Sequence, residues 1–154
     1  MEARIHVFEI RIHSLQKQQP CRPREYSVGL DRASEARMRC VFCGSRGKHY
    51  RDSCTRDRDS KRRKLLLKRD NRCNMCLQMD CPATEDCPKF WVFCFHCEQM
   101  GHHSAICSKP DISQRLQDDI DEALVELQQT RSQVDSIRRK LGMETLPFSP
   151  TSPR

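Results

Sequence analysis

Hydrophobic residues follow a helical period most clearly in the last third of the chain. Two series recur there at every seventh position: Ile120, Leu127, Val134 and Leu141, and with them Leu116, Ala123, Thr130 and Ile137. Apolar residues at the a and d positions of a heptad form a narrow stripe along a helix, and this stripe needs a partner. Asp111 is a suitable N-cap residue and Gly142 a suitable stop. The pattern therefore predicts a coiled-coil helix over residues 111–142.

The two ends of the chain carry weaker patterns. Ile5, Val7, Ile10 and Ile12 alternate imperfectly with other residues, which predicts a short strand in the N-terminal segment, residues 1–39, and no further fold. Residues 143–154 are rich in proline and serine, a composition that predicts a disordered tail.

Composition argues against an ordinary single core. Of the 154 residues, 36% are hydrophobic in a count that includes 11 cysteines, and 32% are charged. Without the cysteines, too few apolar residues remain to order a domain of this length, so metal ions or disulfides must contribute. No apolar stretch is long enough to cross a membrane, and the first residues do not resemble a secretion signal. We therefore expect an intracellular protein, cytoplasmic and/or nuclear, whose clustered cysteines bind metal rather than form disulfides.

The clearest of three cysteine clusters is the third, in residues 88–110. Its ligands follow the pattern Cys94-x2-Cys97-x4-His102-x4-Cys107. Gly101 allows a sharp turn just before the histidine. Three sulfurs and one nitrogen form the tetrahedral shell that structural zinc prefers, so the spacing predicts a zinc knuckle.

The other two clusters have related spacings. The first, in residues 40–54, has one extra residue before its histidine: Cys40-x2-Cys43-x5-His49-x4-Cys54. The second, in residues 73–87, has cysteine in place of histidine: Cys73-x2-Cys76-x4-Cys81-x5-Cys87. Four thiolates form an equally good zinc shell. The sequence thus predicts three zinc modules and three zinc ions per chain.

Other assignments of these residues remain open at this point. A zinc ribbon would pair Cys73 and Cys76 with the first two cysteines of the third cluster, at the cost of leaving several other cysteines without a role. His96 and His103 are alternative ligands to His102. Cys21 lies outside every cluster, and we expect it to be an unpaired thiol without a catalytic role.

The tandem clusters resemble the CCHC zinc knuckles of retroviral and retrotransposon nucleocapsid proteins. The run from Cys40 to Cys107, with its basic connector, is most similar to the Gag region of animal BEL/Pao-type LTR retrotransposons. The third cluster matches the family pattern, the first departs in spacing, and the second departs in spacing and in one ligand. The resemblance implies small metal-stabilised modules that bind the RNA of the element. No Asp-[Ser/Thr]-Gly protease triplet and no Tyr-x-Asp-Asp polymerase motif occurs, so the resemblance extends to a Gag-like fragment alone.

Positive charge is concentrated between the first two clusters. The chain carries a net charge of +7, and the connector, residues 55–72, alone accounts for +6. Because it lacks glycine and proline, the connector is predicted to form a short basic helix. Its basic residues are candidate phosphate contacts: Lys61, Arg62, Arg63, Lys64, Lys68 and Arg69. The run from Lys61 to Lys64 also matches a short nuclear import signal.

Apolar side chains on the clusters are candidate stacking surfaces for unpaired bases. They are Phe42, Tyr50, Trp91, Phe95 and Met100. For Phe42 and Phe95 the alternative is packing against their own metal loops, and for Trp91 it is packing between the second and third clusters.

Together these features predict a fold class of small metal-stabilised zinc-knuckle modules with one long C-terminal α-helix and little regular sheet. The predicted function is zinc-dependent binding of single-stranded RNA or DNA, with RNA favoured, by a protein that is not an enzyme and has no small-molecule substrate. The alternative is a protein-interaction adaptor. The heptad stripe predicts a homodimer through residues 111–142, and the alternative is a helix that folds onto its own chain.

Overall fold

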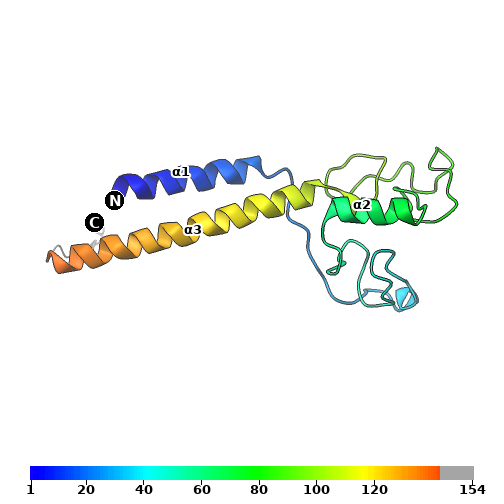
Figure 1. The fold of residues 1–154 in the computed structure, drawn as a ribbon, viewed down its shortest axis with the longest axis horizontal. Helices are drawn as coiled ribbons and strands as arrows, with labels where there is room; N and C mark the ends of the chain where they lie inside the picture. Colours follow the sequence, from blue (N-terminus) through cyan, green and yellow to red (C-terminus); the bar gives the residue numbers. More distant parts are fainter. Residues whose placement is uncertain (143–154) are drawn as a thin grey trace, which may run out of the picture. The chain divides into compact units, whose positions relative to one another are not determined.

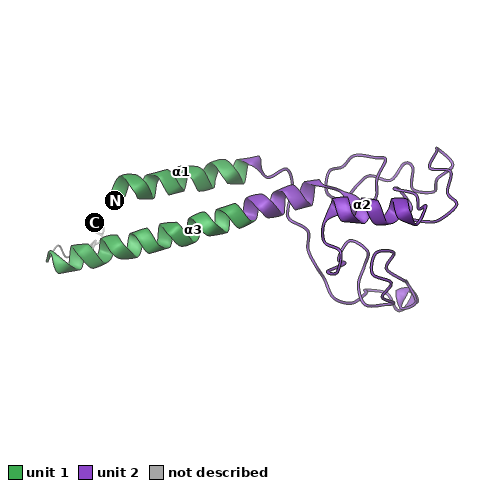
Figure 2. Cartoon of the chain, viewed as in Figure 1, with its two compact units in different colours: residues 1–17, 118–154 green, residues 18–117 purple. Residues whose placement is uncertain are grey.

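The computed structural model describes residues 1–142, which form two units (Figures 1 and 2). The first, which we call the helix-pair unit, combines residues 1–17 with residues from 118 onward, and the second, the zinc unit, spans residues 18–117. The regular elements are α1 (Glu2–Gln18), η1 (Ala33–Glu35), α2 (Ser60–Arg69), η2 (Ser104–Ile106) and α3 (Lys109–Lys140).

The regular structure is mostly helical and ends in one long C-terminal helix, as predicted. Within residues 1–142, pairing of the β type is limited to two isolated bridges, Arg39 with Arg46 and Arg72 with Met79. No helix among the described residues is long and apolar enough to cross a membrane. The predicted disordered tail, residues 143–154, lies outside the described residues.

The predicted strand near the N-terminus is wrong, because these residues form helix α1. The buried positions are Phe8 and Ile12, with Ile5 and Leu15 partly buried beside them. These four residues are spaced three, four and three apart, which places them on one face of a helix. The apparent alternation arose from Val7 and Ile10, whose side chains are exposed. Packing of the helical face outweighed the β propensity of the branched residues.

In the helix-pair unit, α1 packs antiparallel to the C-terminal part of α3 (Figure 1). Phe8 and Ile12 pack against Ile120, Ala123 and Leu127, which belong to the heptad stripe. Two ion pairs link exposed positions along the same contact. The Arg131 guanidinium lies 2.7 Å from the Glu9 carboxylate, and that of Arg138 lies 2.7 Å from the Glu2 carboxylate. The stripe on α3 is therefore covered, over this stretch, by a helix of its own chain.

Homodimerisation through residues 111–142 stays a prediction. Between Ile120 and Leu127 the side chains that would carry it contact α1, whereas Ile137 and Leu141 are exposed. The predicted stop is confirmed at Gly142, which has φ 65° just after the helix ends. The predicted N-cap is wrong: α3 begins at Lys109, and Asp111 lies in its first turn.

Helix α2 forms inside the basic connector, as predicted. The Asp59 side chain caps it by accepting hydrogen bonds from the backbone N–H groups of Lys61 and Arg62. Asp111 of α3 adds a further acceptor, because its carboxylate lies 2.8 Å from the Ser60 backbone nitrogen. The start of α2 is thus held by side chains from two segments.

One face of α2 is buried in the zinc unit. The buried residues, spaced as one helical face, are Ser60, Arg63, Leu66 and Leu67. The two leucines join a core to which every cysteine cluster contributes. Cys40, Phe42 and Cys54 come from the first cluster, Leu77 from the second, and Ala105 and Ile106 from the third. The three modules therefore share one core and are not independent folding units.

Residues 19–39 pack along the first and third clusters and the start of α3. The Gly29 backbone N–H donates to the Lys48 carbonyl, and the Gly47 N–H donates to the Met38 carbonyl. The Tyr50 hydroxyl donates to the Glu35 carboxylate at 2.6 Å. This segment, for which the sequence predicted no fold, therefore completes the packing around the first cluster.

Candidate zinc centre

The structure brings each of the three predicted ligand sets together. The ligand atoms of each set all lie within 4.8 Å of one another. The sets are Cys40, Cys43, His49 and Cys54; Cys73, Cys76, Cys81 and Cys87; and Cys94, Cys97, His102 and Cys107. All 11 cysteines are free thiols, so the clusters are held by no disulfide. The three clusters fit three zinc ions per chain and are compatible with zinc knuckles.

The same backbone turn occurs at all three clusters. The N–H group just after the second cysteine, from Gly44, Leu77 and Glu98 in turn, donates to the carbonyl of the first cysteine at 2.8–2.9 Å. That same residue has positive φ in every cluster, between 58° and 75°. The N–H group of each first cysteine donates in turn to the carbonyl five residues later. This turn directs both sulfurs of the C-x2-C pair toward one point.

The backbone before the third ligand also has a similar conformation in the three clusters. The residue before it has positive φ in two clusters, Asp80 in the second and Gly101 in the third. In the first cluster this role falls to Gly47, two residues before His49, and the change accommodates the extra residue there. Cys81 and Cys87 complete the second cluster in the same way as the histidine-containing shells. The zinc-ribbon alternative is therefore wrong, because Cys73 and Cys76 lie with these two cysteines.

Gly47 offers a sharp test of the first turn. A Cβ atom on Gly47 would lie 2.4 Å from the Ala36 carbonyl oxygen, whereas one on Gly44 would have no atom within 4 Å. Both residues have positive φ, so alanine at either position costs about 1–2 kcal/mol of backbone strain. Gly47→Ala must in addition displace backbone, and we expect it to lower the free energy of unfolding by about 3 kcal/mol.

Urea unfolding of the zinc-loaded protein measures this difference, with Gly44→Ala as the matched control. The control position is occupied by Leu77 and Glu98 in the other clusters, so a side chain is tolerated there. Equal losses for the two variants would show that the contact with Ala36 does not constrain the first cluster.

Hydrogen bonds and burial divide the thiols of the first cluster into two kinds. Burial raises the pKa of Cys40 to about 12. For Cys43, burial is outweighed by hydrogen bonds with Ser45 and His49, which lower its pKa to about 6. In the third cluster, burial likewise raises the pKa of Cys107 to about 12. Zinc must displace the protons that such thiols retain, so the affinity for zinc falls as the pH falls.

The two other histidines of the third cluster are not in the ligand set. His103 accepts a hydrogen bond from the Ala105 backbone at its Nδ1 atom, and burial lowers its pKa to about 4. The Nε2 atom of His96 lies 3.0 Å from the Asp52 carboxylate of the first cluster. Burial opposes ionisation of Asp52, but the hydrogen bond from His96 and the charge of Arg24 hold its pKa below the usual range. The His103 side chain thus caps η2, the His96 side chain connects the third cluster to the first, and neither belongs to a ligand set.

Two buried arginines connect the first and third clusters. Arg24 pairs with Asp52 and donates to the carbonyls of Ser104, at 3.1 Å, and Cys107, at 2.8 Å. Arg63, which is fully buried, donates to the carbonyls of four residues at 2.6–3.2 Å: Asp52, Cys54, Asp57 and Ala105. Its guanidinium also lies 5.1 Å from the centre of the Phe42 ring.

The burial of these side chains corrects two predicted contacts. Arg63 and Phe42 were both predicted to contact nucleic acid, but both belong to the interior of the zinc unit. The spacing of Arg63, Leu66 and Leu67 on one helical face was a signal for this in the sequence. No pattern in the sequence indicated the roles of Arg24, Asp52 and His96, because their partners lie far along the chain.

The other predicted contacts lie nearer the surface. Phe95 is 85% exposed, Trp91 is 67% exposed, and Met100 is also exposed, whereas Tyr50 is partly buried. The remaining basic residues of α2 are exposed: Lys61, Arg62, Lys64, Lys68 and Arg69. Cys21 is outside the clusters, as predicted, and its sulfur lies 3.8 Å from the Ser113 hydroxyl.

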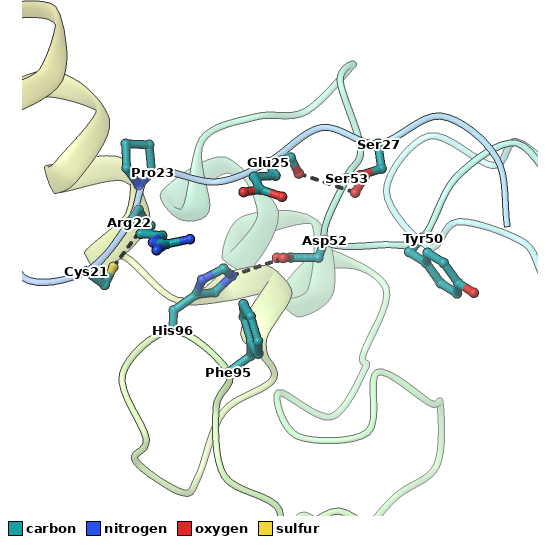
Figure 3. Close-up of a pocket in the computed structure, with 10 residues that line it drawn as sticks. All are labelled: Cys21, Arg22, Pro23, Glu25, Ser27, Tyr50, Asp52, Ser53, Phe95 and His96. Atoms are coloured by element: carbon teal, nitrogen blue, oxygen red, sulfur yellow. Dashed lines mark hydrogen bonds and ion pairs between the residues drawn. The ribbon is translucent and has the colours of Figure 1, made fainter. Parts of the chain in front are cut away.

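Phe95 and His96 border a pocket of about 430 Å³ (Figure 3). The other lining residues are Cys21, Arg22, Pro23, Glu25, Ser27, Tyr50, Asp52 and Ser53. Within it the Ser53 hydroxyl donates to the Glu25 carbonyl, and His96 contacts Asp52, as the dashed lines in Figure 3 mark. The pocket therefore joins the aromatic ring of the third cluster to polar groups of the N-terminal segment and the first cluster.

Comparisons of the chain with family models, with curated proteins and with solved structures found no match.

Proposed function

We propose that this protein binds single-stranded nucleic acid, with RNA preferred over DNA, through its zinc-loaded clusters and without catalysing a reaction. Phe95 carries the proposal. It lies between two predicted zinc ligands, Cys94 and Cys97, yet its side chain is 85% exposed. Its backbone is held by a hydrogen bond from its N–H group to the Ser104 hydroxyl at 2.8 Å. An exposed aromatic ring on an anchored backbone, beside a pocket, is suited to stacking with an unpaired base.

Positive charge near the same cluster supports a polyanionic partner. Lys64 lowers the pKa of His102, after the larger effect of burial. Arg51 and Lys89 act in the same sense on the pKa of His103, again after burial. With the exposed basic residues of α2, these groups provide charge that phosphates can neutralise.

Phe95→Ala is expected to weaken binding to a single-stranded RNA by about tenfold, because stacking contributes about 1–3 kcal/mol per base. Fluorescence anisotropy with a labelled single-stranded RNA measures the affinity, and a DNA strand of the same sequence tests the preference. Phe93→Ala is the matched control, since Phe93 is the same residue type and is also exposed, at 63%, but lies outside the metal turn. RNA binding that survives complete removal of zinc by a chelator would overturn the proposal.

A Gag-derived origin is part of the same proposal. It is supported by the third cluster, whose ligand spacing and glycine before the histidine match the family pattern, and by the basic connector. In this interpretation the protein keeps the nucleic-acid-binding part of a retrotransposon polyprotein.

A second candidate function is a protein-interaction adaptor. The observation that favours it is a run of exposed apolar side chains, Trp91, Val92 and Phe93, just before the third cluster. Contiguous exposed apolar surface is typical of sites that bind other proteins. If Phe93→Ala abolished binding of a protein partner while RNA binding was absent in the wild type, this function would replace the first.

A further inference from the structure

Four arginines line one cleft between the first and second clusters. The cleft has a volume of about 480 Å³, and its basic residues are Arg39, Arg51, Arg69 and Arg72. The rest of its wall is made by apolar, thiol and amide side chains and by a glycine, and no carboxylate lines it. Of the four arginines, Arg69 alone is among the phosphate contacts that the sequence predicts.

Two of these arginines occupy equivalent places in two metal turns. Arg39 immediately precedes Cys40, and Arg72 immediately precedes Cys73. Each is fixed by an isolated β-bridge across its turn, Arg39 with Arg46 and Arg72 with Met79. The repeated turn therefore places one arginine from each cluster in the wall of the same cleft, and the loop at Arg51 and the end of α2 add the others.

The guanidinium groups of the cleft are poorly satisfied within the protein. Among the ion pairs of the described residues, Arg69 has a carboxylate partner, Asp70 at 2.8 Å, whereas Arg39, Arg51 and Arg72 have none. The Nε atoms of Arg51 and Arg72 are buried and make no hydrogen bond. Three of the four guanidinium groups therefore have no carboxylate to balance their charge among the described residues, and an external anion can supply that balance.

We propose that this cleft binds a backbone phosphate of single-stranded RNA through Arg39, Arg51 and Arg72. The inference rests on the proposed function and adds the residues that hold the strand between the first two clusters. The planar guanidinium offers parallel N–H donors that match two phosphate oxygens at once. A phosphodiester keeps its negative charge throughout the physiological pH range, and three converging cations select it over neutral ligands.

Arg39→Gln with Arg51→Gln tests this cleft with the full-length, zinc-loaded protein. Neither side chain donates a hydrogen bond to a loop, in contrast to Arg72, whose Nη1 atom donates to the Leu77 carbonyl. The matched control is Arg32→Gln with Arg56→Gln, which removes the same charge from two exposed positions outside the cleft. Zinc content and thermal unfolding establish that each variant is folded.

Affinity for a single-stranded RNA is measured by anisotropy at about 50 and about 200 mM salt. We expect the cleft variant to bind about tenfold more weakly than the control, with a salt dependence reduced by about one phosphate contact. Arg39→Lys with Arg51→Lys keeps both positive charges but lacks the paired N–H donors of a guanidinium. This variant should keep the salt dependence of the wild type and recover only part of its affinity for RNA. A strand of the same sequence with uncharged linkages should bind the wild type and the cleft variant alike.

A second experiment distinguishes binding of an RNA backbone phosphate from binding of free inorganic phosphate. Inorganic phosphate is added to each protein, and thermal unfolding is followed. Stabilisation of the wild type by phosphate, with RNA affinity unchanged in the cleft variant, would assign the cleft to a free phosphate and overturn the inference. Equal RNA affinity in the cleft variant and the control would overturn it while leaving the proposed function intact. Failure of the wild type to bind RNA at all would overturn both.

Discussion

Serine in place of Cys54 is expected to remove zinc from the first cluster and to unfold most of the zinc unit. The binding free energy of a structural zinc ion is about 10 kcal/mol or more, and in small modules it is the folding free energy. Cys54 is fully buried, and it packs in the core that Leu67, Leu77 and Ile106 share. Loss of this ligand therefore removes support from the second and third clusters as well. Zinc content measured on the purified variant should fall from three per chain to two or fewer.

Two matched variants show whether the shared core carries this effect. Cys21→Ser alters a thiol outside the clusters and should keep three zinc ions. Cys87→Ser removes a ligand whose side chain packs in a separate small group with Cys73, Met75 and Cys76, so its effect should be confined to the second cluster. The rate at which a chelator removes zinc from the remaining clusters distinguishes an effect that spreads through the shared core from one that is confined to the altered cluster. If Cys54→Ser left the third cluster as resistant as in the wild type, the modules would be independent after all.

Arg63→Met is expected to lower the free energy of unfolding of the zinc unit by about 3 kcal/mol. The change leaves the carbonyls of Asp52, Cys54 and Ala105 buried without their donor. These carbonyls belong to loops of the first and third clusters, so both sites should lose rigidity together. The gain from burying methionine offsets part of this loss but supplies no hydrogen bond.

Lys64→Met is the matched control for Arg63→Met. It removes a positive charge from the next residue of α2, where the side chain is exposed, and should change the stability by about 0.5 kcal/mol or less. Urea unfolding followed by tryptophan fluorescence reports on Trp91 near the third cluster. NMR resonances of residues in the first cluster report on the stability of that cluster. Similar stability of the two variants would show that the buried hydrogen bonds of Arg63 contribute little.

The metal ligands could be predicted because their chemistry is local. Each set spans few residues, and the spacing alone determines whether four donors can surround one ion. The same holds for α2 and for the end of α3, where Asp59 and Gly142 mark helix boundaries by short-range hydrogen bonding and backbone conformation. The N-terminal helix could not be predicted in this way. Its β-branched residues fit both the two-residue period of a strand and the 3.6-residue period of a helix, and the sequence does not show which side chains a packing partner will bury.

Contacts between distant segments could not be predicted in the same way. The basic connector looked uniform in the sequence, yet Arg63 is buried as a donor to four carbonyls while its neighbour Lys64 stays at the surface. Phe42 and Phe95 both lie between the two cysteines of a metal turn, one position apart, and Phe42 is buried whereas Phe95 is exposed. Arg63 and Phe42 are buried where α2 packs against the three clusters.

The amino-acid pattern was therefore sufficient for three zinc sites, a basic helix and a long C-terminal helix, because each depends on residues that are neighbours in the chain. The same pattern was insufficient to predict which side chains of these elements are buried and which lie at the surface. Packing around α2 buries Arg63 and Phe42, and it brings Arg39, Arg51 and Arg72 into one cleft. Burial depends on the full set of neighbours in space, and for a chain with so small a core these neighbours come from every part of the zinc unit.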